Sequence, residues 1–313
     1  MVQTVASIHL PVDEKLEIRK NRLTPSAPTG AEKRICIVTG IHGDELEGQF
    51  VCYELSRRLQ EHPEWLTGIV DIYPAMNPMG IDSITRGIPM FDLDMNRIFP
   101  GNPDGAVPEY MASQIIGDMQ GADFVIDIHA SNIFLREIPQ ARISEITAEA
   151  LLPYAKLLGL DFIWIHSAAT VLESTLAHSL NTLGTKTIVV EMGVGMRITR
   201  EYGCRLVNGI LNLMRDQGLW QGPVAPVRAP IISSDGKVGF VNADASGIFV
   251  PCVEHWRAIG AGDPMGDILD PLTGQVKQHV TAPVSGMIFT LREYPVVYSG
   301  SLLARILGGV TDA

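Results

Sequence analysis

Short apolar runs alternate with helical patterns between residues 34 and 216, and this alternation limits the possible folds more than any other feature. Each run has four to six residues. The apolar runs are residues 34–39, 68–73, 123–128, 161–165 and 187–190. Apolar residues at helical spacing occupy residues 46–59, 111–119, 144–158, 171–183 and 200–216. Continuous apolar strands separated by helices predict an α/β fold around a buried, largely parallel sheet.

The pattern changes near residue 221, where a proline-rich segment indicates a linker. Beyond it the helical patterns stop, and short β-rich runs punctuated by Gly and Pro follow. These runs are residues 238–241, 247–253, 278–280, 286–291 and 301–306. The sequence therefore predicts two domains, a catalytic α/β domain over residues 1–222 and a small all-β domain, sandwich- or barrel-like, over residues 223–313.

Charge and composition exclude several classes of partner. The chain has 24 Lys and Arg against 35 Asp and Glu, a net charge of −11, so it has no basic excess for nucleic acid or anionic lipid. No apolar run approaches the ~18 residues of a membrane span, and the first residues lack the order of a signal peptide. The four cysteines are widely spaced, which argues against a disulfide framework. We expect a cytoplasmic protein.

A candidate metal site follows the first apolar run. His42 and Glu45 stand three residues apart in the turn that follows residues 34–39, and His129 follows the run at 123–128. Ligands bind at the carboxyl ends of strands in open α/β sheets, so these three side chains can converge there. Two His and one Glu leave a fourth tetrahedral position for water, which is typical of a catalytic zinc site. We expect Asp127 to point to the opposite face of its strand.

Further motifs appear in a fixed order. The tetrapeptide HGDE at 42–45 is followed by Asn77-Pro78, by Arg86 and by the run DMNRIFPG at 94–101. A strand ending in D-x-H at 127–129 and a strand ending in E-x-G at 191–193 complete the set. This order resembles the succinylglutamate desuccinylase/aspartoacylase family over residues ~34 to 200. The resemblance implies a three-layer zinc-carboxypeptidase-like domain with a mixed, largely parallel central sheet.

The resemblance also assigns roles to residues. His42, Glu45 and His129 match the ligands of one Zn²⁺ per chain, and Glu191 matches the catalytic carboxylate. Glu191 suits this role because it ends a buried apolar strand beside glycines that leave room. A free carboxylate there can take a proton from water and deliver it to the leaving amine.

Three more residues match the family's substrate contacts. Arg86 resembles the arginine that polarises the scissile carbonyl, and a fixed guanidinium there stabilises an oxyanion. Asn96 and Arg97 resemble the pair that holds the substrate carboxylate, which fits the fork of a guanidinium beside an amide.

These assignments predict a zinc-dependent deacylase, an amidohydrolase that cleaves the amide of a small, carboxylate-bearing N-acyl amino acid or related amine. Zinc-activated water is the nucleophile and Glu191 the general base. A metallocarboxypeptidase-like peptide hydrolase and a non-catalytic zinc- or ligand-binding module are the alternatives. The C-terminal part is expected to form a rim around the site or a contact in a homo-oligomer.

One family feature is missing from the sequence. Aspartoacylases are expected to carry a cationic residue shortly before the catalytic Glu, but residues 155–190 hold no Arg and only Lys156 and Lys186. Arg136, Arg197 and Arg200 are the candidate substitutes. We therefore expect an amine portion less acidic than aspartate or glutamate. Among the other histidines, only His166 is expected near the mouth of the site.

Overall fold

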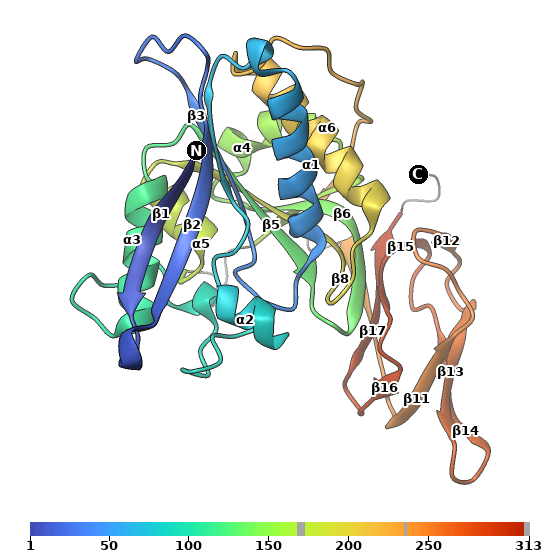
Figure 1. The fold of residues 1–313 in the computed structure, drawn as a ribbon. Coiled ribbons are helices and arrows are strands. Elements are labelled where there is room, and N and C mark those ends of the chain that lie inside the picture. The colour runs from blue at the N-terminus through green and yellow to red at the C-terminus, as the bar shows by residue number, and fades with distance from the viewer. Residues whose placement is uncertain (168–172, 235–236, 310–313) are drawn as a thin grey trace.

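A large mixed sheet organises the computed structural model, which describes residues 1–167, 173–234 and 237–309 (Figure 1). Within these ranges the sheet has 13 strands, and along its main path they are ordered β1-β2-β4-β3-β5-β8-β6-β15-β17-β10. Its strands are β1 (Val2–His9), β2 (Lys15–Leu23), β3 (Arg34–Thr39), β4 (Ile69–Tyr73), β5 (Phe124–Ser131), β6 (Leu135–Ser144), β7 (Phe162–His166), β8 (Lys186–Val194), β9 (Ile231–Ser234), β10 (Val238–Asn242), β12 (Ala258–Ile259), β15 (Gly286–Arg292) and β17 (Leu302–Gly308).

The centre of this sheet is parallel, and an antiparallel pair joins it to each flank. β3 pairs in parallel with β4 and β5, and β5 pairs in parallel with β8. β2 runs antiparallel to β4, and β6 runs antiparallel to β8. The predicted mixed α/β fold is thereby confirmed, whereas the expected largely parallel sheet is found only at its centre, because most of the other strand pairs are antiparallel.

Helices and the N-terminal hairpin cover the two faces of the sheet. The helices are α1 (Glu47–Glu61), α2 (Pro78–Ser83), α3 (Val107–Met119), α4 (Ala148–Ala155), α5 (Leu176–Thr182) and α6 (Arg200–Asp216). Successive strand residues point to opposite faces, so Ile35 and Ile37 join the core under α1, α4 and α6. Cys36 and Val38 join the core formed with α3, α5 and the β1–β2 hairpin. α1 and α6 lie side by side in Figure 1.

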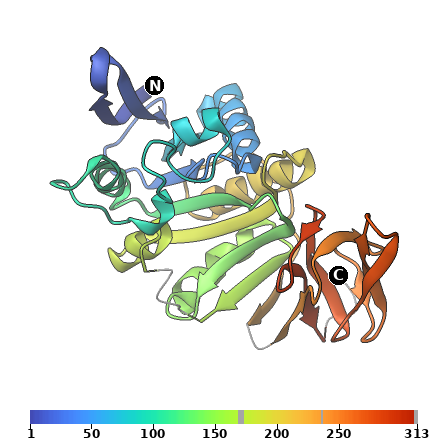
Figure 2. The same cartoon turned by 90° about the horizontal axis from the view of Figure 1, so that it is seen from below.

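The C-terminal segment extends the large sheet and adds a second one. β15 pairs antiparallel with β6, and β9 pairs in parallel with β7, so strands from both parts of the chain share one sheet. The second sheet, ordered β14-β13-β11-β16, consists of β11 (Gly247–Pro251), β13 (Pro264–Asp270), β14 (Gln275–Thr281) and β16 (Val296–Val297). Figure 2 shows the N-terminal hairpin and these C-terminal strands at opposite ends of the molecule. The division between residues 222 and 223 stays a prediction.

Each predicted strand overlaps an observed one, whereas the helices differ at their ends. The helix predicted at 144–158 starts at Ala148, because Ser144 still belongs to β6, and its last three residues form a 3-10 turn. The helix predicted at 171–183 starts at Leu176, and residues 171–172 lie outside the described residues. The strands that were not predicted are β1, β2, β6, β9, β12, β13 and β16. None of the helices in the described ranges has the length and apolar character that crossing a membrane requires.

Candidate metal centre and site cavity

The turn between β3 and α1 carries the first two candidate ligands, and a close backbone approach shapes it. An ideal Cβ on Gly43 would lie 1.9 Å from the carbonyl carbon of Gly80 in α2, so only glycine fits there. The Gly43 amide also donates to the Arg86 carbonyl at 3.4 Å. This packing fixes His42 and Glu45 on either side of Gly43 and turns both side chains inward.

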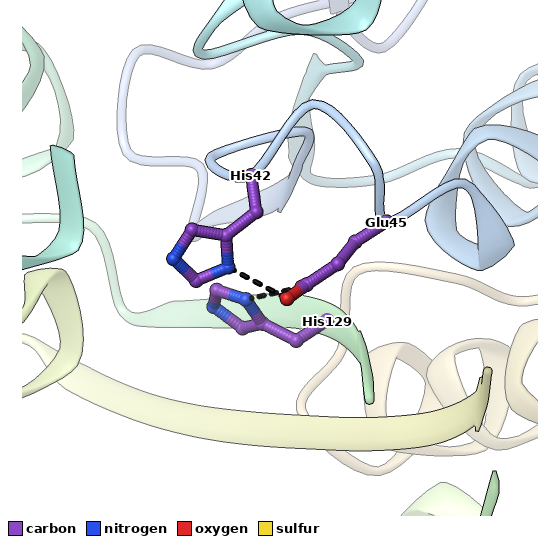
Figure 3. Close-up of side chains that lie close together, drawn as sticks. All are labelled: His42, Glu45 and His129. Atoms are coloured by element: carbon purple, nitrogen blue, oxygen red, sulfur yellow. Dashed lines mark hydrogen bonds and ion pairs between the residues drawn. The ribbon is translucent and has the colours of Figure 1, made fainter. Parts of the chain in front are cut away.

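His42, Glu45 and His129 come together in the structure. Their candidate ligand atoms all lie within 4.8 Å of one another, and all three side chains are buried. Glu45 lies between the two rings, with Oε1 2.7 Å from His42 Nδ1 and Oε2 2.9 Å from His129 Nδ1 (Figure 3). Figure 3 shows both rings directed at this carboxylate. The sequence placed these residues at two strand ends, and the structure joins them at that edge.

A second carboxylate contacts the outer nitrogen of each ring. His42 Nε2 lies 3.0 Å from Asp94 Oδ1, and His129 Nε2 lies 3.1 Å from Asp127 Oδ1. The expectation that Asp127 points away from the site is wrong, because residues two apart in a strand share a face. A carboxylate on Nε2 keeps a proton there and leaves Nδ1 free to act as a metal ligand. For His42 this contact is a hydrogen bond, whereas for His129 it is an ion pair.

The charges within this cluster shift the pKa values of its three members. Burial alone would lower the pKa of His42, but Glu45 and Asp94 outweigh it and raise that pKa. Burial likewise opposes the charge of His129, yet Asp127 and Glu45 raise its pKa well above the usual value. Burial would raise the pKa of Glu45, but the two histidines lower it to about 2. The carboxylates therefore favour positive charge at this position, and a metal bound there would displace any proton on the ligand nitrogens.

The donor set fits a divalent ion of the zinc type. Two imidazole nitrogens and one carboxylate are the ligands of many catalytic zinc sites, with one position left for water. A carboxylate lies at the outer nitrogen of each ring, as is usual for histidines that bind a metal. The residues present thus suit Zn²⁺, and the ligand assignment stays a proposal.

A cavity of about 610 Å³ adjoins this cluster, which is a size suited to a small molecule. All seven site residues predicted from the sequence line it. They are His42, Glu45, Arg86, Asn96, Arg97, His129 and Glu191. We call this space the site cavity. His166 lines it as expected, and so does His178, for which the sequence offered no role.

Arg86 lies beside the metal cluster and is held by two carboxylates. Its Nη1 donates to Glu45 Oε1 at 3.1 Å, and its Nε donates to Asp94 Oδ2 at 3.2 Å. Asp94 thus contacts both His42 and Arg86, which fixes the guanidinium next to the candidate ligands. The role of Asp94 was missed, although it opens the run at 94–101 from which Asn96 and Arg97 were chosen.

Asn96 and Arg97 occupy a short 3-10 turn, Met95–Arg97, at the wall of the site cavity. Asn96 is buried, and its Oδ1 accepts from the Leu176 amide at 2.9 Å, which ties this turn to the start of α5. Arg97 is exposed and donates to the Asn96 carbonyl at 2.8 Å. Among the described residues no carboxylate forms an ion pair with Arg97, so its charge is available to a ligand.

Glu191 lies on β8 directly beside His129 on β5 in the parallel ladder. Burial raises the pKa of Glu191, although the positive charges of Arg142 and His129 act to lower it. Its Oε1 lies 3.2 Å from Arg142 Nη1. A half-buried carboxylate with a raised pKa is suited to accept and return a proton.

The cations of the site cavity differ from those suggested by the sequence. Arg136 instead pairs with Glu293 at 2.9 Å, and neither Arg197 nor Arg200 is among the described residues that line the cavity. Arg142 and Arg305 line it instead. The sequence did not point to either residue. Arg142 lies in a strand that was not predicted, and Arg305 lies 163 residues further along the chain.

Comparisons with known proteins find matches over most of the chain. The family model for the succinylglutamate desuccinylase/aspartoacylase catalytic domain matches residues 31–216, more than half of the chain. N-alpha-acetyl-L-2,4-diaminobutyric acid deacetylase from Halomonas elongata is 31% identical over 278 residues, which cover 85% of this chain and 75% of the relative.

Solved structures share the fold over nearly the whole chain. The ectoine utilization protein EutE (DoeB) from Ruegeria pomeroyi superposes with a TM-score of 0.80 at 22% identity, covering 95% of this chain and 90% of that one. A succinylglutamate desuccinylase from Silicibacter sp. TM1040 gives a TM-score of 0.84 at 21% identity, covering 97% and 94%. At these identities the likeness concerns the fold alone. The family model and the curated relative together show that the chain belongs to the succinylglutamate desuccinylase/aspartoacylase family.

Proposed function

We propose that this protein is a zinc-dependent deacylase that hydrolyses the amide bond of a small N-acyl amino acid. The observation that carries the proposal is the convergence of His42, Glu45 and His129 in one cavity with Glu191 and Arg86. We also propose that the fold is the three-layer zinc-carboxypeptidase arrangement, and that the protein works in the cytoplasm, since its four cysteines are free.

Zinc would be held by Nδ1 of His42, Nδ1 of His129 and the Glu45 carboxylate. Bound there, Zn²⁺ supplies Lewis-acid polarisation and lowers the pKa of water toward ~7. Asp94 and Asp127 would keep the Nε2 protons in place and orient the two rings. The protein residues keep the ligands in this arrangement, and Glu191 and Arg86 take part in the remaining steps.

Glu191 acts first as a base and then as an acid. Its carboxylate takes a proton from the attacking water, and it later gives that proton to the leaving nitrogen as the C–N bond breaks. The products are a free carboxylate and a free amine, so one water is consumed. Arg86, fixed by Glu45 and Asp94, faces the carbonyl oxygen and stabilises the negative charge that develops on it.

Arg97 binds the substrate carboxylate, because its guanidinium lies at the cavity wall without a carboxylate partner among the described residues. Asn96 holds the turn that carries Arg97 in place through its bond to the Leu176 amide. The Asn96 carbonyl orients the guanidinium.

The amine portion is neutral or cationic rather than acidic. The two further arginines of the site cavity, Arg142 and Arg305, already pair with Glu191 and Glu137. A second substrate carboxylate would therefore have to displace one of these partners, at the cost of an unpaired buried charge. The relative from Halomonas elongata supports a cationic amine portion, because the diaminobutyrate in its name carries an additional amine. We place N-acetyl-2,4-diaminobutyrate first among the candidate substrates.

A hydrolysis screen tests the proposal. The purified protein, loaded with Zn²⁺, is offered N-acetyl, N-formyl and N-succinyl amino acids, and release of free amine is measured. We expect turnover of short N-acyl amino acids with neutral or basic side chains, and weaker turnover of N-acetylaspartate and N-succinylglutamate.

The screen includes tripeptides and tetrapeptides. Turnover of these peptides in preference to N-acyl amino acids would favour the metallocarboxypeptidase alternative. Binding of Zn²⁺ without turnover of any compound would favour a non-catalytic module. Either result would contradict the proposed deacylase.

A further inference from the structure

We propose that Arg142 is a positioning residue for Glu191, and that Arg305 on the last strand holds Arg142 in place through Glu137. The inference rests on the proposed role of Glu191 and adds a route by which C-terminal strands reach the reacting group. Without Arg142, the Glu191 carboxylate would lose the guanidinium that contacts its Oε1.

Arg142 bridges two carboxylates with separate nitrogens. Its Nη1 lies 3.2 Å from Glu191 Oε1, and its Nη2 donates to Glu137 Oε1 at 3.1 Å. Arg142 belongs to β6, which runs antiparallel to β8 beside Glu191. A planar guanidinium held at one end therefore fixes the carboxylate at its other end.

Glu137 is the buried carboxylate that joins Arg142 to Arg305. Its side chain is 1% exposed and accepts from four donors. Besides Arg142, these are Arg305 Nη1 at 2.7 Å, Thr290 Oγ1 at 2.7 Å and Gln140 Nε2 at 2.6 Å. Arg305 lies on β17 and Thr290 on β15, so two of the four donors come from the C-terminal segment.

Trp164 restricts both guanidiniums further. The Cζ atoms of Arg142 and Arg305 each lie 5.5 Å from the centre of its ring, within the range of cation–π attraction. Two arginines that share one carboxylate and one aromatic ring have few alternative rotamers. The cluster thus holds Arg142 stiffly at the wall of the site cavity.

A stabilising role alone does not account for these charges. Burying ions costs desolvation free energy, and a well-packed apolar set of similar volume is often at least as stable. The charges lie instead where they reach Glu191 and line the cavity. An alignment role explains that placement, because even a displacement of ~1 Å of a catalytic group can slow a reaction about 100-fold.

The test compares steady-state rates of Arg142→Met, Arg305→Met and Glu137→Gln with the wild-type protein. We expect each change to lower kcat about 10- to 100-fold while KM changes less than about threefold, because substrate binding relies on other residues. Arg142→Lys should recover only part of kcat, since an ammonium cannot bridge both carboxylates in one plane. Zinc content and the unfolding midpoint are measured for every variant.

Matched controls separate alignment from general damage. Arg136→Met removes another β6 arginine that pairs with the C-terminal segment, through Glu293, and Arg257→Met removes an exposed C-terminal arginine. Both should keep kcat within about twofold. If the loss of kcat follows the loss of the unfolding midpoint across all variants and controls, the cluster is merely structural and the inference is overturned.

A double variant tests whether the residues act in sequence. Since Arg305 works through Arg142, Arg142→Met/Arg305→Met should lose no more kcat than Arg142→Met alone. Losses that multiply, or that fall on KM only, would overturn the inference. If Glu191→Gln keeps the wild-type rate, the proposed function itself fails. If Glu191→Gln is inactive while Arg142→Met is normal, only the positioning role fails.

Discussion

At the scale of single residues, the site is built from imidazoles and guanidiniums that each contact carboxylates. His42 and His129 share Glu45 at one nitrogen and contact Asp94 and Asp127 at the other. Such pairing fixes ring orientation before any ligand binds, so little reorganisation is needed during the reaction. Removing one of these carboxylates should therefore affect mainly the side chain that it contacts.

Glu191→Gln removes the proposed base while keeping the shape of the side chain. We expect kcat to fall about 10²- to 10⁴-fold, because proton transfer is lost, with zinc content unchanged. Release of free amine and metal analysis check this together. A rate within tenfold of the wild-type value would show that Glu191 is not the base.

The burial of Glu191 gives the wild-type rate a pH dependence. Because burial raises its pKa, and because only the ionised carboxylate can take a proton, kcat/KM should fall as the pH drops through that raised pKa. A rate profile from pH 5 to 9 at saturating Zn²⁺ tests the sign. A rate that rises on acidification would contradict it.

Asp127→Asn weakens the support of His129. We expect zinc affinity or activity to fall about 10- to 100-fold, because an amide is a poorer acceptor for the Nε2 proton. Competition with a coloured chelator measures the affinity. Asp82→Asn, at an exposed position of α2, is the control and should leave affinity unchanged. Equal effects of the two substitutions would argue against the orienting role of Asp127.

At the scale of elements, the turn between β3 and α1 depends on its contact with α2. Gly43→Ala would place a Cβ against the Gly80 backbone, so the turn must shift and move His42 and Glu45. We expect at least about a tenfold loss of zinc affinity, measured by calorimetry. Gly117→Ala in α3, where a Cβ meets open space, should leave affinity unchanged. Normal zinc binding by Gly43→Ala would contradict this account of the turn.

The N-terminal hairpin is tied to the sheet by the buried carboxylate of Asp71 on β4. Arg22 donates to both of its oxygens, at 2.7 and 2.6 Å, and Lys20 Nζ lies 3.2 Å away. Burial alone would raise the pKa of Asp71, but the hydrogen bond from Arg22 and the charges of Lys20 and Arg22 lower it. Because the folded pKa is lowered, this stabilisation is present above the unfolded pKa of about 3.9 and is lost as pH falls through the folded value.

Asp71→Asn should therefore lower the free energy of unfolding by about 3 kcal/mol near neutral pH. Denaturant titrations at pH 7 and near pH 3 should show the difference from wild type shrinking on acidification. Glu17→Gln, which breaks an exposed ion pair with Arg19 on the same hairpin, should cost less than about 1 kcal/mol. A difference that grows at low pH would contradict the assignment.

Elements differ in how well the sequence predicts them, and the reason is where their partners lie. β3, β5 and β8 are buried on both faces, so their apolar runs could be recognised directly. β6 contains Arg136, Glu137 and Arg142, and it is a strand because those charges find partners on other elements. β1 and β2 bury only some of their residues, so neither has a continuous apolar run.

The same reasoning applies to the site. His42, Glu45 and Glu191 lie in short sequence motifs, and their grouping around one cavity could be predicted. The chemistry assigned to them stays a prediction. Arg305 lies more than 160 positions from Arg142, and no local pattern connects the two. Only the antiparallel pairing of β15 with β6 brings the last strands to the cavity.

At the scale of the whole molecule, the net charge does not describe the site cavity, which arginines and carboxylates line together. The chain carries a net charge of −11, yet Arg86, Arg97, Arg142 and Arg305 line the site cavity. The net charge leaves no basic excess for nucleic acid, whereas the guanidiniums of the cavity are groups of the kind that bind carboxylates. The C-terminal segment contributes to this cavity, since Arg305 reaches it from β17 of the large sheet.

Zinc titration of the metal-free protein tests the central claim most directly. The protein is stripped with a chelator, Zn²⁺ is added stepwise, and release of amine from N-acetyl-2,4-diaminobutyrate and other N-acyl amino acids is followed. Activity should be absent at the start, rise linearly and reach a plateau at one Zn²⁺ per chain, and His129→Ala should not respond. Full activity in the stripped protein, or none after one equivalent binds, would contradict a zinc-dependent deacylase.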